Sequence, residues 1–385
     1  MRLADKRRFR RDPLAYLEDL HRHSVDGVIR LPWGGRCVGD VELANALLRG
    51  REFNAGRSGF FGGLLPTREA QVRVGHAVRD VVRAGLPAYR EALAVAVGGL
   101  PGTSRWPDAA GDLVYRCLVD VLLHPRTPED VRGLLDRAAR GDVVFHSPHR
   151  WRRVGAEVVR ARLVAAVAGE VRRRRGWDGG ARDVLDAVAG ACPGGVADRA
   201  VAELHLMLVR AVVVPVATML AWSVLLACLR HPPGTPLPWP VDWVVREAQR
   251  HRPVVWMVGR AAPHPTEFAG APCDAGELIS VSPYLLHHDP DRWDDPDEFR
   301  PERWAEPGRR GTYIPFGAGP FTCAGASVAH ELLTEALGAL TRDATLAVIG
   351  GDLRPAMVEG AVPRPFTLHR TPVRQAARTE GGERR

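Results

Sequence analysis

The chain has 385 residues, 45% hydrophobic and 25% charged, a composition typical of a soluble globular protein with one large domain or two average ones. Its six cysteines are scattered without paired spacing, which argues against a disulfide framework and a zinc site and favours a reducing cytosol. The formal net charge is +8, and Lys6 is the only lysine. No zinc-finger, helix-turn-helix or RNA-recognition signature accompanies this charge, so we expect no nucleic-acid binding.

The N-terminal residues 1–11 are basic and polar, with no apolar run long enough to anchor or export the chain. We therefore expect a cytoplasmic protein with no membrane attachment. The strong preference for arginine over lysine suggests a high-GC bacterial gene. The densest basic run, residues 172–175, is interpreted as a solvated helix end.

The first part of the chain alternates helices with short strands. A helix begins at Asp12-Pro13, two short strands flank a Gly-Gly turn within residues 27–38, and Asp40 can cap the next helix. A glycine-rich loop with Phe60 and Phe61 follows. Residues 68–97 are predicted to be helical with a break at Pro87.

The middle of the chain, residues 107–232, is predicted to be mainly helical. Its longest apolar run, residues 204–229, could span a membrane by length alone, but His205, Arg210 and Pro215 favour a buried core helix. A further helix over 241–252 ends before a proline.

Short strands are expected around residues 254–258 and 278–281. Beyond them, residues 374–385 are expected to form a disordered polar tail.

A glycine-rich turn around Cys323 is the most informative stretch. It holds Phe316, Gly319 and Gly325, and apolar residues at helical spacing follow it. A sulfur at a helix N-terminus faces unpaired N–H groups, which favour the thiolate, and the glycines leave room for a large flat ligand. A thiolate axial ligand of heme iron needs these features. The alternative is a buried free cysteine before an ordinary helix.

Three motifs in order resemble the cytochrome P450 superfamily of heme-thiolate enzymes. They are Phe-x-x-Gly-x-x-x-Cys-x-Gly over 316–325, Glu247-x-x-Arg250, and a meander over 287–304 with Phe299, Pro301 and Arg303 at the expected positions. The resemblance implies a mainly α fold with small β-sheets, one domain over 1–385, and heme b. Cys323 would be the axial iron ligand, with Phe316, Gly319 and Gly325 shaping the cofactor site.

The resemblance also assigns roles to charged and aromatic residues. Glu247, Arg250 and Arg303 would form a buried triad beneath the heme, since two arginines can satisfy one buried carboxylate. Two residues before Cys323 the superfamily usually has Arg or His on a heme propionate, but here stands Phe321. The propionate would then need Arg79 or Arg260.

The distal side departs further from the superfamily, whose central helix carries an acid and a threonine that deliver protons for dioxygen cleavage. Here Val214 and Pro215 take those positions, beside Val213, and Thr218 one turn later is a weak substitute. Pro215 removes a helix hydrogen bond and can supply a kink. The distal pocket is expected to be apolar, with Phe60 and Phe61 in the loop above it.

These features predict a heme-thiolate oxidoreductase, similar to monooxygenases, of bacterial specialised (secondary) metabolism. The missing donors favour chemistry driven by peroxide, assisted by a substrate hydroxyl, or acting on a substrate with its own N–O or O–O bond. A conventional monooxygenase and a non-catalytic helper homologue remain alternatives. The expected partners are a small-molecule substrate, an acidic ferredoxin and a ferredoxin reductase.

Overall fold

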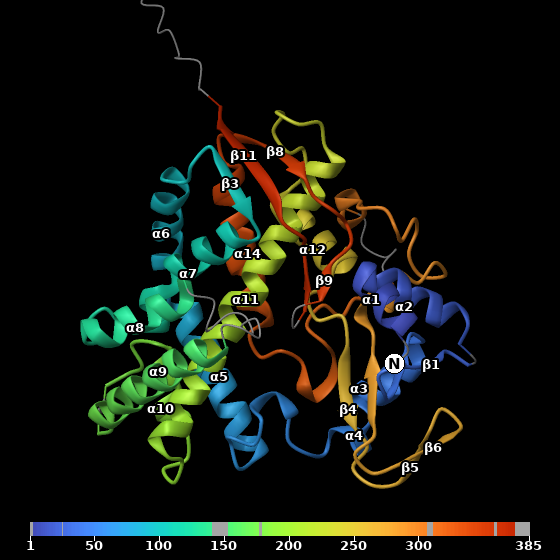
Figure 1. Ribbon diagram of the computed structural model, residues 1–385, viewed down its shortest axis with the longest axis horizontal. Helices are drawn as coiled ribbons and strands as arrows, with labels where there is room; N and C mark the ends of the chain where they lie inside the picture. The colour runs from blue at the N-terminus through green and yellow to red at the C-terminus, as the bar shows by residue number, and fades with distance from the viewer. Residues whose placement is uncertain are drawn as a thin grey trace, which may run out of the picture.

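Helices form most of the structure, which is a computed structural model that describes residues 3–24, 26–140, 153–176, 179–305, 311–357 and 360–373 (Figure 1). The polar tail expected over 374–385 lies outside these residues. The α-helices are α1 (Leu3–Arg11), α2 (Pro13–Arg22), α3 (Val41–Arg49), α4 (Arg51–Asn54), α5 (Arg68–Ala84), α6 (Leu86–Gly98), α7 (Asp108–Leu122), α8 (Glu129–Arg140), α9 (Arg153–Arg174), α10 (Val184–Ala191), α11 (Asp198–Arg230), α12 (Val241–His251), α13 (Pro283–His287) and α14 (Ala326–Thr341).

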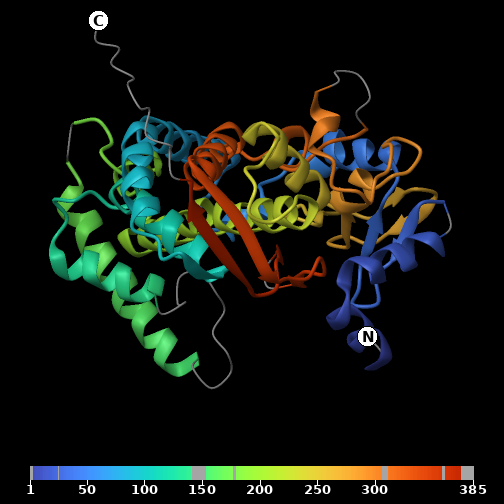
Figure 2. The same cartoon turned by 90° about the horizontal axis from the view of Figure 1, so that it is seen from above.

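The strands form small separate sheets. They are β1 (Val28–Arg30), β2 (Arg36–Val38), β3 (Thr103–Trp106), β4 (Val258–Ala261), β5 (Thr266–Phe268), β6 (Ala271–Cys273), β7 (Leu278–Val281), β8 (Ala344–Gly350), β9 (Ala356–Met357), β10 (Ala361–Val362) and β11 (Phe366–Pro372). The sheet orders are β1-β2-β7-β4 and β3-β11-β8, with two further pairs, β5-β6 and β9-β10. In Figure 2 the cyan and green helices gather at one end, and the N-terminal segment lies with the orange strands at the other.

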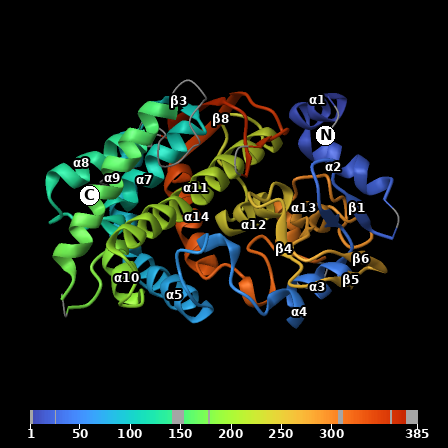
Figure 3. The same ribbon diagram turned by 60° about the horizontal axis from the view of Figure 1, so that its bottom comes forward.

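Helix α11 is the central element and crosses the molecule diagonally in Figure 3, with α14 nearby. Its residues are apolar on most sides, and it packs against α7, α9, α12 and α14. Among the described residues it is the one helix long and apolar enough to cross a membrane, yet 78% of its most apolar window is buried. This agrees with the expected core helix.

Polar residues begin several helices where the sequence indicates. The side chains of Asp12 and Asp40 accept hydrogen bonds from the N–H groups of Ala15 and Leu43, at the starts of α2 and α3. The predicted break near Pro87 falls at Gly85, between α5 and α6. Such caps satisfy N–H groups that have no partner inside the helix.

The strand expected over residues 254–258 is displaced. Strand β4 begins only at Val258, which pairs with Val281 at the end of the four-residue strand β7. The preceding carbonyls bond elsewhere, because Val254 O accepts from Ala361 N and Trp256 O from the Ser282 hydroxyl. The apolar residues before 258 therefore make single hydrogen bonds and no regular strand pairing.

The sequence predicted that the basic run at the end of α9 is solvated, but one of its arginines is buried. The Arg174 side chain is buried and forms ion pairs with Glu170, Asp183 and Asp186 at 2.5–2.8 Å. Its charge therefore stabilises the α9–α10 junction. Arg172 and Arg175 pair at the surface with Asp198.

Candidate functional site

The turn that carries Cys323 is held by backbone contacts. Short helix η4 (Gly319–Phe321) precedes the cysteine, the Cys323 N–H donates to Phe316 O at 3.0 Å, and α14 begins three residues later. Gly319 has φ +73°, and a Cβ there would lie 2.0 Å from Leu48 O, so no side chain fits. Gly325 is the N-cap of α14, where an added Cβ would lie 4.0 Å from the Cys323 sulfur.

Cys323 differs from the other five cysteines, because it alone is exposed. Burial of the thiol group nevertheless raises its pKa, and a hydrogen bond from the Gly325 backbone only partly opposes this. The turn by itself therefore does not favour the thiolate, contrary to the sequence-based expectation. A coordinated metal removes the thiol proton outright, so an iron ion would reverse this balance.

The three charged residues predicted to form a triad lie together in the core. Both oxygens of Glu247 accept from Arg250, at 2.8 and 3.1 Å, and Oε1 also accepts from Arg303 Nε at 3.0 Å. The Arg300 N–H and the Trp304 indole donate to the same carboxylate at 2.9 and 3.0 Å. Glu247 and Arg250 are fully buried, so this carboxylate is satisfied entirely within the protein.

The distal segment of α11 continues helically through Pro215. Val214 and Pro215 are partly exposed, whereas Val213 is buried in the core and Thr218 is only 5% exposed. The partly exposed side chains of this segment, those of Ala211, Val212, Val214 and Pro215, contain no group that can donate a proton.

The two loop phenylalanines have different surroundings. Phe60 is 52% exposed, whereas Phe61 is buried and belongs to the same hydrophobic cluster as Val213. Their rings meet edge to face, with centroids 5.0 Å apart. Of the two, only Phe61 lies in the cluster that includes the distal helix.

The two arginines considered for a heme propionate are very different. Arg79 is paired at the surface with Asp80 at 2.8 Å. Arg260, on β4, is buried, its Nε donates to Asn54 Oδ1 at 2.7 Å, and its Nη2 has no hydrogen-bond partner among the described residues. A buried donor of this kind and an exposed cysteine residue suit a heme, which needs an axial ligand and partners for its carboxylates.

Two residues near this arginine were missed in the sequence. Arg68 begins α5, and its guanidinium carbon lies 4.9 Å from the centre of the Phe321 ring. Asn54 ends α4 and is buried. A buried asparagine in a short segment between glycines has no distinctive spacing, so no sequence pattern indicates its role.

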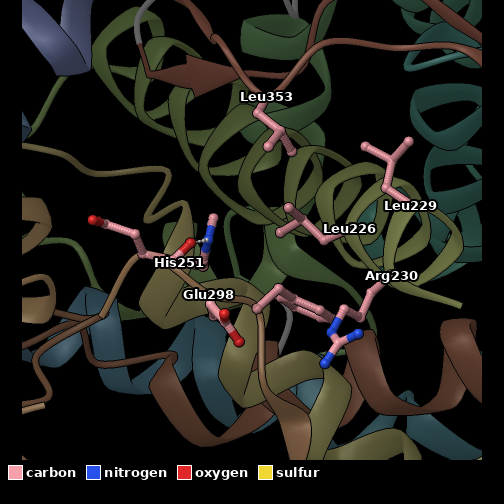
Figure 4. Close-up of a pocket in the computed structure, with 8 residues that line it drawn as sticks. Leu226, Leu229, Arg230, His251, Glu298 and Leu353 are labelled. Carbon is pink, nitrogen blue, oxygen red and sulfur yellow. Dashed lines mark hydrogen bonds between the residues drawn. The ribbon is translucent and has the colours of Figure 1, made fainter. Parts of the chain in front are cut away.

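A cavity of about 340 Å³ lies elsewhere, at the C-terminal end of α11. Its lining includes Leu226, Leu229 and Leu353 together with the charged residues Arg230 and Glu298 (Figure 4). Neither Cys323 nor the distal segment contributes to its lining. It is therefore separate from the candidate site.

Comparisons with known proteins agree with these observations. Residues 240–359 match the family model described as Cytochrome P450, and this segment contains the triad and Cys323. A stretch of 86 residues is 41% identical to cyclooctat-9-en-7-ol 5-monooxygenase of Streptomyces melanosporofaciens, covering 21% of this chain and 19% of that protein. Another of 89 residues is 38% identical to cytochrome P450 3A29 of Sus scrofa, covering 22% and 18%. The chain thus matches about a fifth of these relatives' length.

Solved structures show the fold over nearly the whole chain. A zebra fish cytochrome P450 with progesterone superposes with a TM-score of 0.75 at 20% identity, covering 94% of this chain and 99% of that one. The open cytochrome P450 EryK from S. erythraea gives 0.72 at 21% identity, covering 94% and 97%. The chain therefore has the cytochrome P450 fold, mainly α with small sheets, as expected. Members of the matched family bind heme, and the relatives include a monooxygenase, which agrees with the expected heme b and oxidoreductase activity.

Proposed function

We propose that this chain is a heme-thiolate oxidoreductase of the cytochrome P450 superfamily, in which Cys323 is the axial ligand of heme iron. The observation that carries the proposal is the presentation of Cys323: it is the one exposed cysteine of six, in a turn whose glycine cannot be replaced. When bound, heme would supply the oxidative chemistry. The chain's own residues would hold it and control access of protons and water.

The turn and its surroundings have distinct tasks in this proposal. Phe316 is partly buried and its carbonyl accepts from the Cys323 N–H, Gly319 lets the turn pack against Leu48 O, and Gly325 places no side chain beside the sulfur. Arg260 would bind a propionate through its unpartnered nitrogen. Glu247 and its arginines support the fold beneath this turn and do not take part in the reaction.

The distal wall favours chemistry that does not depend on protons delivered by the protein. Val214 and Pro215 cannot donate a proton, and Thr218 is buried one turn away. General acid catalysis contributes about 10²–10⁴-fold in rate, so dioxygen-driven turnover should be slow and should release peroxide. A peroxide-driven reaction, a substrate hydroxyl or a substrate with a weak N–O or O–O bond would avoid this deficit.

The experiment is to introduce the acid and the threonine that the distal helix lacks. Val214→Asp with Pro215→Thr is compared with wild type in a reductase-driven and in a peroxide-driven reaction. The substrate in both is a small apolar ligand, chosen because it shifts the heme absorption band. We expect the double variant to increase product per electron pair in the reductase-driven reaction and to leave peroxide-driven turnover largely unchanged. Thr218→Val serves as the control and should change neither.

The conventional alternative would be supported by tight coupling in wild type. Tight coupling means that little NAD(P)H is consumed without product in the reductase-driven reaction. In that case a water chain or a substrate hydroxyl delivers the protons in place of the missing acid and threonine, and the protein is an ordinary monooxygenase. The helper alternative requires a chain that binds no heme. The exposed Cys323 opposes it.

The biological setting follows the same proposal. A place in bacterial specialised metabolism is supported by the arginine-rich composition and by the similarity to a Streptomyces monooxygenase. We propose a cytoplasmic protein that acts on a small molecule. Where electrons are needed, an acidic ferredoxin with its reductase would provide them, attracted by the basic surface.

A further inference from the structure

The Phe321 ring is in contact with two guanidinium groups. The guanidinium carbons of Arg68 and Arg260 each lie 4.9 Å from the centre of this ring. The two arginines come from distant parts of the chain, the first turn of α5 and strand β4. Arginine stacks readily on aromatic rings, so one side chain of the cysteine turn brings two cations together.

A single buried residue fixes both arginines. Asn54 is 2% exposed, and its amide nitrogen donates to Leu47 O and Gly50 O at 2.9 and 2.8 Å. Its side-chain oxygen accepts from Arg260 Nε, and its backbone oxygen accepts from Arg68 Nη1, both at 2.7 Å. The arrangement is therefore built into the fold and does not depend on flexible surface side chains.

The charge of this cluster is not balanced by the protein. Among the described residues no carboxylate forms an ion pair with Arg68 or Arg260, and Arg260 Nη2 has no hydrogen-bond partner. Burial lowers the pKa of Arg260, as expected for a cation without a counter-ion. An anion at this position would satisfy both groups, and the planar fork of arginine suits a carboxylate.

The position of Phe321 indicates which carboxylate. Phe321 stands two residues before Cys323, at the end of the short helix η4, so the clamp lies beside the proposed iron ligand. We infer that Arg68 and Arg260, held together by Phe321 and Asn54, form a clamp for a heme propionate. Phe321 would thus replace the usual basic residue by positioning two other basic residues. This inference rests on the proposed function.

The test compares hemin with hemin dimethyl ester, whose propionates carry no charge. Each is loaded into the apoprotein, and its release to excess apomyoglobin is followed by absorbance. A charged hydrogen bond contributes enough that wild type should release the ester about 10–100-fold faster than hemin. Arg68→Gln and Arg260→Gln should accelerate hemin release and leave ester release nearly unchanged, so that the discrimination shrinks.

Further variants separate positioning from charge. Phe321→Ala should reduce the ratio of ester release to hemin release. Phe321→Tyr should keep this ratio, because either aromatic ring can stack on guanidinium groups. Arg79→Gln tests the surface arginine and should keep the wild-type discrimination. If Arg260→Gln does not fold, Arg260→Lys takes its place, because lysine keeps the positive charge.

Several results would overturn the inference. One is a wild-type protein that releases hemin and its ester at equal rates, a measurement that needs no variant. A second is that Arg68→Gln and Arg260→Gln accelerate the release of hemin and of its ester equally, which would be a structural effect. A third is that Arg79→Gln removes the difference between the two release rates. If the clamp binds a substrate carboxylate and not a propionate, hemin and its ester would be released at equal rates, as they would be without a clamp. Failure of the proposed function is distinct, because reduced wild type would then lack the carbon monoxide band of a thiolate–heme complex.

Discussion

His287 Nε2 accepts a hydrogen bond from the backbone N–H of Ile314 at 2.9 Å, at the start of the loop that leads to Cys323. On its other side Nδ1 donates to Arg250 O at 3.1 Å. One imidazole thus connects the helix of the buried triad to the cysteine loop. Only the neutral tautomer protonated on Nδ1 makes both bonds. Burial, and then the nearby Arg250 charge, lower the His287 pKa from 6.5 to about 3.

This pKa makes stability depend on pH. Because the folded state binds the proton only near pH 3 and the unfolded state near 6.5, the unfolded state gains protons between these values. Stability is therefore fully present above pH 6.5 and is lost as the pH falls towards 3, by up to about 1.4 kcal/mol per pH unit for one proton. Urea denaturation at pH 7.5, 6 and 5 should show a falling midpoint.

His287→Gln separates this residue from the other histidines. The variant should be less stable at pH 7.5, because glutamine cannot keep both hydrogen bonds in this geometry. Its stability should also depend less steeply on pH. Some dependence should remain, because burial lowers the pKa of His251 and His288 as well. Equal slopes in variant and wild type would show that His287 does not titrate on unfolding.

The Glu247 triad predicts a large structural effect. Glu247→Ala leaves the buried Arg250 without its carboxylate, a change that costs about 3–5 kcal/mol. We expect aggregated or heme-free protein, measured as the ratio of heme to protein absorbance in the soluble fraction. Arg90→Ala is a matched control, since it breaks an exposed pair with Glu335 and should change stability by about 0–1 kcal/mol. A soluble, heme-loaded and merely slow Glu247→Ala protein would contradict a structural role.

Electron delivery is predicted to depend on salt. Arg83 is exposed on α5, and its guanidinium donates to the Ser327 hydroxyl at 2.7 Å, in the first turn of α14 and close to Cys323. Docking of an acidic ferredoxin there should be steered by charge, so the reduction rate should fall steeply between low and physiological salt.

A charge reversal tests where docking occurs. Arg83→Glu should slow reduction by about tenfold at low salt, because steered association depends strongly on local charge. Arg199→Glu, in an exposed pair with Glu203 at the start of α11, should have little effect. Stopped-flow rates that are indifferent to salt and to both substitutions would indicate another electron source.

The sequence predicted the main elements because their signals are local. Apolar periodicity and capping residues indicated α2, α3 and α11, and the order of three motifs indicated that Glu247, Arg250 and Arg303 meet. Strands β3 and β8 were not predicted, because each is defined by pairing with β11 from the end of the chain. Short strands that depend on distant partners carry little local information.

The carboxylate clamp was beyond sequence reasoning for a similar reason. Phe321 was interpreted as the loss of a basic residue, because its contacts with Arg68 and Arg260 join three distant segments. The pKa of Cys323 was also misjudged. The N–H groups near a helix start were visible in the sequence, but the burial that raises the thiol pKa was not. The contacts of Phe321 and the burial of the Cys323 thiol both depend on how segments pack, which local patterns do not encode.

The most direct measurement is the absorption of reduced protein under carbon monoxide. Wild type should show the red-shifted Soret band of a thiolate–heme complex, and Cys323→Ser should lose it while keeping its fold by circular dichroism. Cys192→Ser, at a partly buried cysteine outside the turn, should keep the band. A Cys323→Ser protein with the unchanged band, or a wild type that binds no heme, would contradict the account.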